Sequence, residues 1–559
     1  MPGHPATVVE LRVLEGPNAF FPKPAVKLVL DVGPLTSADG SLLAALGGKP
    51  GGPGSLQRRR WTARLVGGLV RDVAAAAGTG RLAVRSRPGH DVDRLVVAFP
   101  WRARGRAEAL ALAVADLVAQ LPSGVDRRAA MVADAASRVA AADPGEPASV
   151  RRPGVPTVAV TGTNGKTTTT RLIAHIGRAA GLSVAWTSTD GVYVDGVALE
   201  HGDWSGPGGA ALALDQPGLG LAVLETARGG ILLRGMAVSA VDVGVVTNVA
   251  ADHLGLQDIH TVDELAEVKA VVARVVRAGG WVVLNGDDPR VLAMRTQSKG
   301  TPIVFSLDPH SPSIRTALDA GGSAVTVADG SMCLVDRRGD LDPVLPVLEV
   351  PVTLSGLSSH NTANALAALG AAVGLGLPRA AIVEGLRTFV PDLDLNPGRM
   401  NLWDCAGVAV VVDLAHNEDG LRALLQVARG LRLPGGSVRL VAGTAGDRTD
   451  EVLRGIGHIA VHGADDVAVA DKLRYLRDRD ASELHEQISE GAGQPLERYP
   501  DELTALGVLV SRSSSGDVVA VMCHEQLDEV GAYLRSRGGT VLDAEQVATR
   551  VRAAQAGSR

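Results

Sequence analysis

A run of twelve residues, Val158–Thr169 (VAVTGTNGKTTT), contains the residue types that bind a nucleotide phosphate. A β-branched stretch leads into a glycine-bearing turn, and Lys166 and Thr167 then open a helix. Backbone N–H groups in such a turn, together with the helix N-terminus, attract anions. Lys166 can reach the β- and γ-phosphates of a nucleotide, and the Thr167 hydroxyl can ligate Mg²⁺. An ordinary strand-to-helix turn is the alternative interpretation, and the flanking pattern disfavours it. The predicted nucleotide-binding loop comprises Gly162, Thr163, Asn164, Gly165, Lys166, Thr167 and Thr168.

Two further candidates follow strand-like runs downstream of this loop. Glu225 ends the run that begins with Leu221–Leu224, and His253 comes soon after the run Val243–Thr247. Ligands of parallel sheets bind at the carboxyl ends of the strands, where both residues are expected to lie. A carboxylate and an imidazole there can share Mg²⁺, although imidazole is the less common ligand. Alone, either residue is as well explained as a surface carboxylate or a loop histidine. Their order after a phosphate loop favours a metal site.

Strands and helices alternate from Thr157 onward, a pattern typical of a doubly wound parallel sheet. The strand-like runs of this central region are Thr157–Thr161, Ser183–Thr187, Leu221–Leu224, Val241–Thr247 and Trp281–Leu284. Its helix-like runs are Thr167–Ala180, Thr261–Ala278, Asn361–Gly374 and Pro378–Thr388. A second α/β unit begins near Arg399, with strand-like runs Val408–Asp413, Val438–Ala442, Asp466–Ala470 and Val518–Met522. Its winding is expected to be Rossmann-like, and the lack of G-x-G-x-x-G disfavours dinucleotide binding.

The pattern of the first part of the chain predicts a small α+β domain without an obvious catalytic residue. Its strand-like runs are Thr7–Leu14, Ala25–Val32 and Arg94–Phe99, and its helix-like runs are Trp61–Ala77 and Ala107–Gln120. Residues 143–156 contain four prolines and indicate an interdomain linker, which few contacts are expected to cross. We therefore predict an α/β protein of three domains: a small α+β domain at 1–150, a P-loop parallel-sheet domain at 153–396 and a Rossmann-like domain at 397–559.

Composition narrows the class of protein. A hydrophobic content of 46% with only 3% aromatic residues fits cores of Val, Ala and Leu around buried parallel strands. The net charge of −6 and the scattered arginines indicate neither a nucleic-acid partner nor a membrane partner. Cys333, Cys405 and Cys523 are too far apart in sequence to suggest a zinc site or a disulfide framework. Together with the absence of a basic-then-apolar leader, they favour a cytoplasmic protein.

Longer motifs carry a resemblance to a known family. The compact Gly-Thr-Asn-Gly-Lys-Thr loop resembles that of Mur ligases and folylpolyglutamate synthetases rather than the common P-loop. Over 155–540 the chain resembles Mur ligases, and more closely the Mur-type half of cyanophycin synthetases. The matching stretches are Trp186–Gly196, Leu224–Leu232, Val245–Gly255, Val283–Pro289, His360–Asn364, Pro397–Arg399, Asp413–Asn417 and Gly443–Arg448. Leu414 stands where the family usually has an aromatic residue, and Leu11–Asn18 resembles the start of cyanophycin synthetases.

The resemblance implies an ATP-dependent ligase that joins a carboxylate to an amine through an acyl phosphate, giving ADP and phosphate. It implies Lys166 on the β- and γ-phosphates, Thr167 and Glu225 on one Mg²⁺, and His253 near a second. Lys269 matches the place of a carbamylated lysine that ligates the second Mg²⁺, which we favour over a solvated helix lysine. Asn285, Asn361 and His416 would line the adenine side, Asp413 the ribose and Arg399 the phosphates. Thr189, Asp190 and Arg228 would face the carboxylate substrate.

Cyanophycin synthetases carry an ATP-grasp domain between their N-terminal and Mur parts, and here only about thirty residues separate Gln120 from Pro153. The resemblance therefore implies one ligation, with arginine as the amine by analogy, and a separate ATP-grasp ligase as a possible partner. A homo-oligomer is expected, and the N-terminal domain is expected to present substrate or to stabilise that oligomer. Two alternatives stay open: a non-catalytic nucleotide-binding scaffold, and an enzyme like folylpolyglutamate synthetase.

Overall fold

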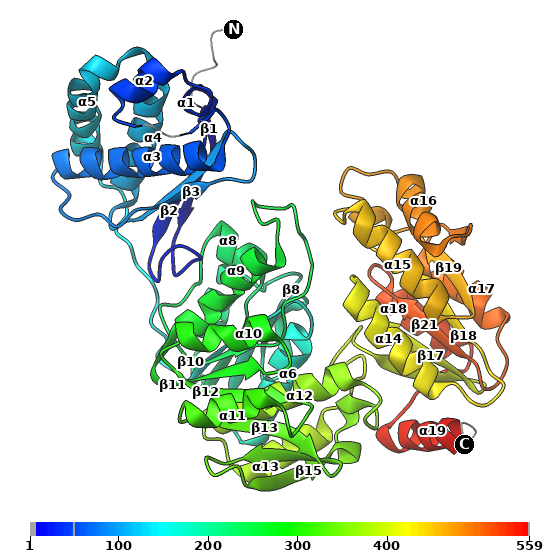
Figure 1. Ribbon diagram of the computed structural model, residues 1–559. Helices are drawn as coiled ribbons and strands as arrows, with labels where there is room; N and C mark the ends of the chain where they lie inside the picture. Colours follow the sequence, from blue (N-terminus) through cyan, green and yellow to red (C-terminus); the bar gives the residue numbers. More distant parts are fainter. Residues whose placement is uncertain (1–6, 49–50, 557–559) are drawn as a thin grey trace.

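The computed structural model describes residues 7–48 and 51–556, which form three sheets, each with its own helices (Figure 1). The first sheet is antiparallel, in the order β1-β2-β4-β3. Its strands are β1 (Thr7–Leu14), β2 (Ala25–Asp31), β3 (Arg85–Pro88) and β4 (Arg94–Pro100). Its helices are α1 (Gly33–Thr36), α2 (Gly40–Ala45), α3 (Leu56–Ala76), α4 (Arg104–Gln120) and α5 (Arg128–Ala141). Buried residues of β2, β4, α3, α4 and α5 share one core.

The central sheet runs in the order β15-β14-β13-β12-β11-β10-β5-β9-β6-β7-β8. The strands from β13 to β6 in this order are parallel, and antiparallel strands extend both edges. The strands are β5 (Thr157–Thr161), β6 (Val184–Ser188), β7 (Gly191–Val194), β8 (Val197–His201), β9 (Leu221–Glu225), β10 (Val241–Val246), β11 (Val276–Asn285), β12 (Thr301–Ser306), β13 (Ser323–Ala328), β14 (Ser331–Val335) and β15 (Leu341–Pro346). Since β5 lies between β9 and β10, the carboxyl ends of these three strands are neighbours.

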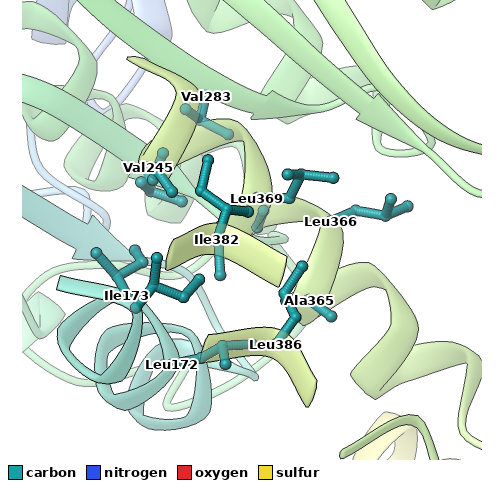
Figure 2. Close-up of a cluster of buried hydrophobic side chains, with 14 of the residues drawn as sticks. Leu172, Ile173, Val245, Val283, Ala365, Leu366, Leu369, Ile382 and Leu386 are labelled. Carbon is teal, nitrogen blue, oxygen red and sulfur yellow. The ribbon is translucent and has the colours of Figure 1, made fainter. Parts of the chain in front are cut away.

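Helices cover both faces of the central sheet. They are α6 (Lys166–Ala179), α7 (Pro207–Leu214), α8 (Arg228–Leu233), α9 (Val262–Arg274), α10 (Pro289–Ala293), α11 (Pro312–Asp319), α12 (Ser359–Gly374) and α13 (Arg379–Thr388). Figure 2 shows the core on one face, where Leu172 of α6, Leu366 of α12 and Leu386 of α13 meet side chains of β10 and β11. This packing fixes the helix that follows the phosphate loop against the sheet.

The C-terminal sheet runs in the order β20-β19-β18-β21-β17-β16-β22, with its first five strands parallel. The strands are β16 (Asn401–Cys405), β17 (Val408–Asp413), β18 (Val438–Ala442), β19 (Asp466–Ala470), β20 (Glu497–Tyr499), β21 (Val518–Met522) and β22 (Thr540–Val541). The helices are α14 (Glu418–Leu431), α15 (Asp450–Gly463), α16 (Ala481–Ala492), α17 (Glu502–Ser511), α18 (Leu527–Ser536) and α19 (Ala544–Ala556). The predicted fold class, a small α+β unit followed by two doubly wound α/β units, is confirmed.

One local prediction needs correction. The helix expected over Thr261–Ala278 begins as predicted, with a capping box between Thr261 and Glu264, but ends at Arg274. The chain then enters β11 at Val276, because β-branched residues there pair with β10. The proline-rich linker contacts the central domain at Arg151, whose carbonyl accepts from the Ser239 N–H over 2.9 Å.

All three cysteines are free and buried, Cys333 in β14, Cys405 in β16 and Cys523 after β21. Burial raises the pKa of each thiol. Among the described residues, no helix has the length and apolarity needed to cross a bilayer.

Candidate active site

A cavity of about 600 Å³ lies at the carboxyl ends of β5 and β9 and extends to the C-terminal domain. Most of the residues predicted as site residues line it: Gly162, Thr163, Asn164, Gly165, Lys166, Thr167, Thr168, Thr189, Glu225, Arg228, His253, Lys269, Asn361, Arg399, Asp413 and His416. The two α/β domains thus share one cavity.

The phosphate loop turns at Gly165, which caps α6 in the left-handed conformation with φ of 83°. A Cβ atom at this position would lie 2.1 Å from Oδ1 of Asn364 on α12. Glycine is therefore required both for the turn and for the close approach of α12. The Lys166 ammonium donates to the Thr163 carbonyl over 2.9 Å, so its charge sits over the loop.

Thr167 and Glu225 form a buried polar pair at the start of α6. The Thr167 hydroxyl donates to Oε2 of Glu225 over 2.9 Å, while Oε1 of Glu225, also buried, has no hydrogen-bond partner. Burial raises the pKa of Glu225, against the opposing charge of Lys166. A hydroxyl next to a buried carboxylate oxygen without a partner is a donor set that fits a hard cation such as Mg²⁺.

Lys269 reaches the same loop from α9. Its side chain is buried, and its Nζ donates to the Gly162 carbonyl over 2.6 Å. Burial, reinforced by the charge of Lys166, lowers the pKa of Lys269 well below its usual range. The neutral amine is thus more accessible here than in an exposed lysine.

His253 lies in the segment between β10 and α9 and adopts a left-handed backbone conformation, with φ of 51°. Its Nδ1 lies 2.8 Å from a guanidinium nitrogen of Arg448 and 3.2 Å from a carboxylate oxygen of Asp447. Arg448 also pairs with Asp252 over 3.3 Å. Burial opposes ionisation of Asp252, but His416, His253 and Arg448 together hold its pKa well below the usual range. A charged network therefore joins the central domain to the C-terminal domain.

Sequence reasoning did not select Asp252, Asp447 or Arg448 as site residues. Asp252 immediately precedes His253, and the other two lie in the Gly443–Arg448 stretch that carried the family resemblance. Their ion pairs connect different domains, which local sequence does not reveal.

The residues expected to contact the nucleotide are divided between two hollows, the main cavity and an adjoining one. Burial raises the pKa of Asp413 to about 6, although Arg399 and the Met400 N–H oppose this rise. Asn285 lies outside the main cavity, where it donates to the Thr247 carbonyl over 2.8 Å and lines an adjoining hollow of about 270 Å³. Asn164 lines both hollows, so the two lie next to each other.

Of the residues expected to face the carboxylate substrate, some line the cavity and one does not. Thr189 places its hydroxyl 3.3 Å from that of Thr167, and Arg228 donates to the His253 carbonyl over 2.7 Å. Asp190 does not line the cavity but forms an ion pair with buried Arg171 over 2.9 Å. Its expected role in substrate binding stays a prediction.

Comparison with known proteins assigns this two-domain arrangement. Residues 160–372 match the Mur ligase middle domain, and residues 398–524 match the Mur ligase glutamate ligase domain. Over these two domains, the chain belongs to the Mur ligase family. Two similar relatives are the cyanophycin synthetases of Crocosphaera subtropica and Synechocystis sp., each 41% identical over 66% of this chain. The matched region is 42% of either relative, so the chain spans less than half of their length.

A ligase of another specificity is a less similar relative. The UDP-N-acetylmuramoyl-L-alanyl-D-glutamate–2,6-diaminopimelate ligase of Chlorobaculum tepidum is 27% identical over 67% of this chain and 72% of its own. Among solved structures, E. coli FolC in complex with DHPP and ADP aligns with a TM-score of 0.53 at 22% identity, covering 69% of this chain and 90% of FolC. This likeness supports the shared fold.

Proposed function

We propose that the chain is an ATP-dependent ligase that joins a carboxylate to an amine and releases ADP and phosphate. The observation that carries the proposal is the buried Thr167–Glu225 pair, with its unpartnered carboxylate oxygen, beside a lysine-bearing phosphate loop. The Mur ligase domains and the similar cyanophycin synthetases support the same reaction class.

The chain's own groups have distinct roles in this proposal. Lys166 and the loop amides hold the β- and γ-phosphates of ATP, and Arg399 approaches from the C-terminal domain. Thr167 and Glu225 would hold one Mg²⁺. His253 would hold a second through Nε2, in the tautomer whose Nδ1–H donates to Asp447, 3.2 Å away. When bound, Mg²⁺ neutralises phosphate charge and polarises the transferring phosphoryl group. Asn285, Asn361 and His416 would face adenine, and Asp413 the ribose.

In this proposal the reaction has two steps. A carboxylate oxygen of the substrate attacks the γ-phosphorus, the bond to the β,γ-bridging oxygen breaks, and ADP leaves. The amine nitrogen then attacks the carbonyl carbon of the acyl phosphate, phosphate leaves with the bonding electrons, and the nitrogen loses a proton. Positioning and charge neutralisation supply most of the catalysis of the first step.

Arg228 and Thr189 are the groups we assign to the carboxylate substrate, together with Asp190 at the adjoining turn. A guanidinium grips a carboxylate with paired hydrogen bonds. Arginine is the proposed amine, by analogy with the cyanophycin synthetases. We further propose that the protein acts as a homo-oligomer in the cytoplasm and that a separate ATP-grasp ligase supplies its acceptor.

The direct test is ligation by the purified chain with MgATP, a panel of aspartate-containing peptides as acids, and amino acids including arginine as amines. We expect ADP release that requires both substrates, together with a product whose mass equals acid plus amine minus water. Binding of MgATP without turnover for any pair would favour the scaffold alternative. Glutamate addition to a folate would favour the folylpolyglutamate-synthetase alternative.

Lys269 is proposed to carry a carbamate that ligates the second Mg²⁺. Carbamylation requires a neutral amine, and burial of Lys269 favours that form. Lys269→Ala is expected to lower kcat by roughly 10²-fold, because the metal loses an anionic ligand. Added formate or acetate should restore part of the activity by occupying the vacated space. Full activity of Lys269→Ala without either anion would exclude the carbamate.

A further inference from the structure

The N-terminal domain contacts the central domain at the end of α8 (Figure 1). The Glu15 N–H donates to the Arg234 carbonyl over 2.7 Å, and the Met236 N–H donates to the Pro17 carbonyl over 2.8 Å. These backbone bonds tie the turn after β1 to the turn after α8. The Leu11–Asn18 stretch, which the proposed chemistry does not use, is thus a docking element.

Glycines make this contact possible. A Cβ atom at Gly16 would lie 1.8 Å from the Met236 carbonyl oxygen, and Gly235 adopts a φ of 80° against Gly16. Buried Asn18 holds the docking turn from within, because its Oδ1 accepts from the Phe20 and Phe21 N–H groups. The turn is therefore built to fit one position on the central domain.

A second contact lies on the segment 252–264, which comprises the last part of the connection from β10 to α9 and the first residues of α9. Arg87 of β3 pairs with Asp258 over 3.3 Å and lies 3.8 Å from Glu264. The ring of His90 stacks on that of His260, with centroids 3.8 Å apart and planes inclined by 14°.

Both contacts act on elements that bear cavity residues. Helix α8 begins with Arg228, and the segment 252–264 begins with Asp252 and His253. Arg228 donates to the His253 carbonyl, so the two elements also hold each other. Within the segment, Gln257 and Asp258 adopt left-handed conformations that non-glycine residues disfavour. Such conformations persist only where surrounding contacts impose them.

We propose that the N-terminal domain positions the Arg228–His253 wall of the cavity, with Arg87 as a positioning residue that acts through Asp258. The inference rests on the proposed ligase function for its catalytic consequence. The N-terminal domain then sets the geometry of the proposed carboxylate-binding site and of the second metal site. The geometry of the phosphate loop does not depend on the N-terminal domain.

The test is a charge swap in the full chain. Arg87→Asp places a carboxylate beside Asp258 and Glu264, and adding Asp258→Arg restores a pair of opposite charges. Arg128→Asp is the control, because Arg128 is about as exposed as Arg87 and forms an ion pair with Asp72, over 3.2 Å, inside the N-terminal domain. Hydrogen exchange of residues 252–264 and of the phosphate loop is measured by mass spectrometry, with steady-state KM values for both substrates.

In Arg87→Asp, we expect exchange of 252–264 to be about five-fold faster and the acceptor KM to rise by a similar factor. Exchange of the phosphate loop and the KM for ATP should stay within about two-fold. The swap should reverse both effects, and the control should show neither. Unchanged exchange at 252–264, or faster exchange with an unchanged acceptor KM, would overturn the proposal. If the wild-type chain ligates nothing, the proposed function fails, and exchange alone then decides whether this domain holds the segment.

Discussion

Lys166→Ala is expected to abolish measurable ligation while leaving the protein folded. The Lys166 ammonium sits over the phosphate loop at its Thr163 carbonyl, where it would meet the charge that develops on the transferring phosphoryl group. Removing one preorganised group of this kind lowers the rate by roughly 10²–10³-fold or more. ATP-dependent phosphate release with a productive substrate pair measures the effect.

The same substitution changes two neighbouring ionisable groups. The charge of Lys166 lowers the pKa of Glu225 and that of Lys269. Its loss therefore favours protonated Glu225 and charged Lys269, and both changes weaken the proposed metal sites. Lys299→Ala, at an exposed lysine of the central domain, is the matched control. Wild-type turnover in Lys166→Ala would refute the proposed role of the loop.

Glu225→Gln is expected to separate metal binding from folding. The substitution keeps the shape and the bond from Thr167 but removes the charge that would hold Mg²⁺. Loss of metal assistance is worth several kcal/mol, so kcat should fall by about 10²-fold or more. Thermal unfolding with and without MgATP, alongside turnover, measures both aspects.

The direction of the stability change follows from the pKa. Because the folded-state pKa of Glu225 is raised, the ionised carboxylate destabilises the empty protein above that pKa. Glu225→Gln should therefore match or exceed the wild type in unliganded stability at neutral pH. It should also lose most of the stabilisation by MgATP, which is about 2.7 kcal/mol at 100 times Kd. Glu200→Gln, at an exposed residue of β8, controls for a surface charge change. An unaltered MgATP shift in Glu225→Gln would contradict the metal assignment.

The sequence was most informative where strands are buried on both faces. Strands β5, β17, β18, β19 and β21 begin and end at the predicted residues, because their continuous apolar runs have few alternatives. It was less informative for the half-exposed β7–β8 hairpin and for the alanine-rich α5, neither of which was predicted. These elements depend on packing against the rest of their domains.

The candidate site likewise has some contacts that can be predicted from the sequence and others that cannot. Lys166, Thr167 and Glu225 lie together because they follow adjacent parallel strands, a relation that can be predicted from their order in the chain. The partner of Asp190 is buried Arg171 of α6, and the partner of His253 is Arg448 of the C-terminal domain. Neither contact follows from local pattern, since each depends on how separate elements pack.

The buried cysteines can serve as intrinsic probes of the opening of the two α/β domains. Thiol reagents attack the thiolate, and burial both shields the three sulfur atoms and disfavours their ionised form. Labelling of Cys333 therefore follows opening of the central sheet near β14. Labelling of Cys405 and Cys523 follows opening of the C-terminal sheet. The N-terminal domain contains none of the three cysteines and gives no signal. One alkylation time course, resolved by peptide, can thus rank the kinetic stability of the two α/β domains in the unmodified chain.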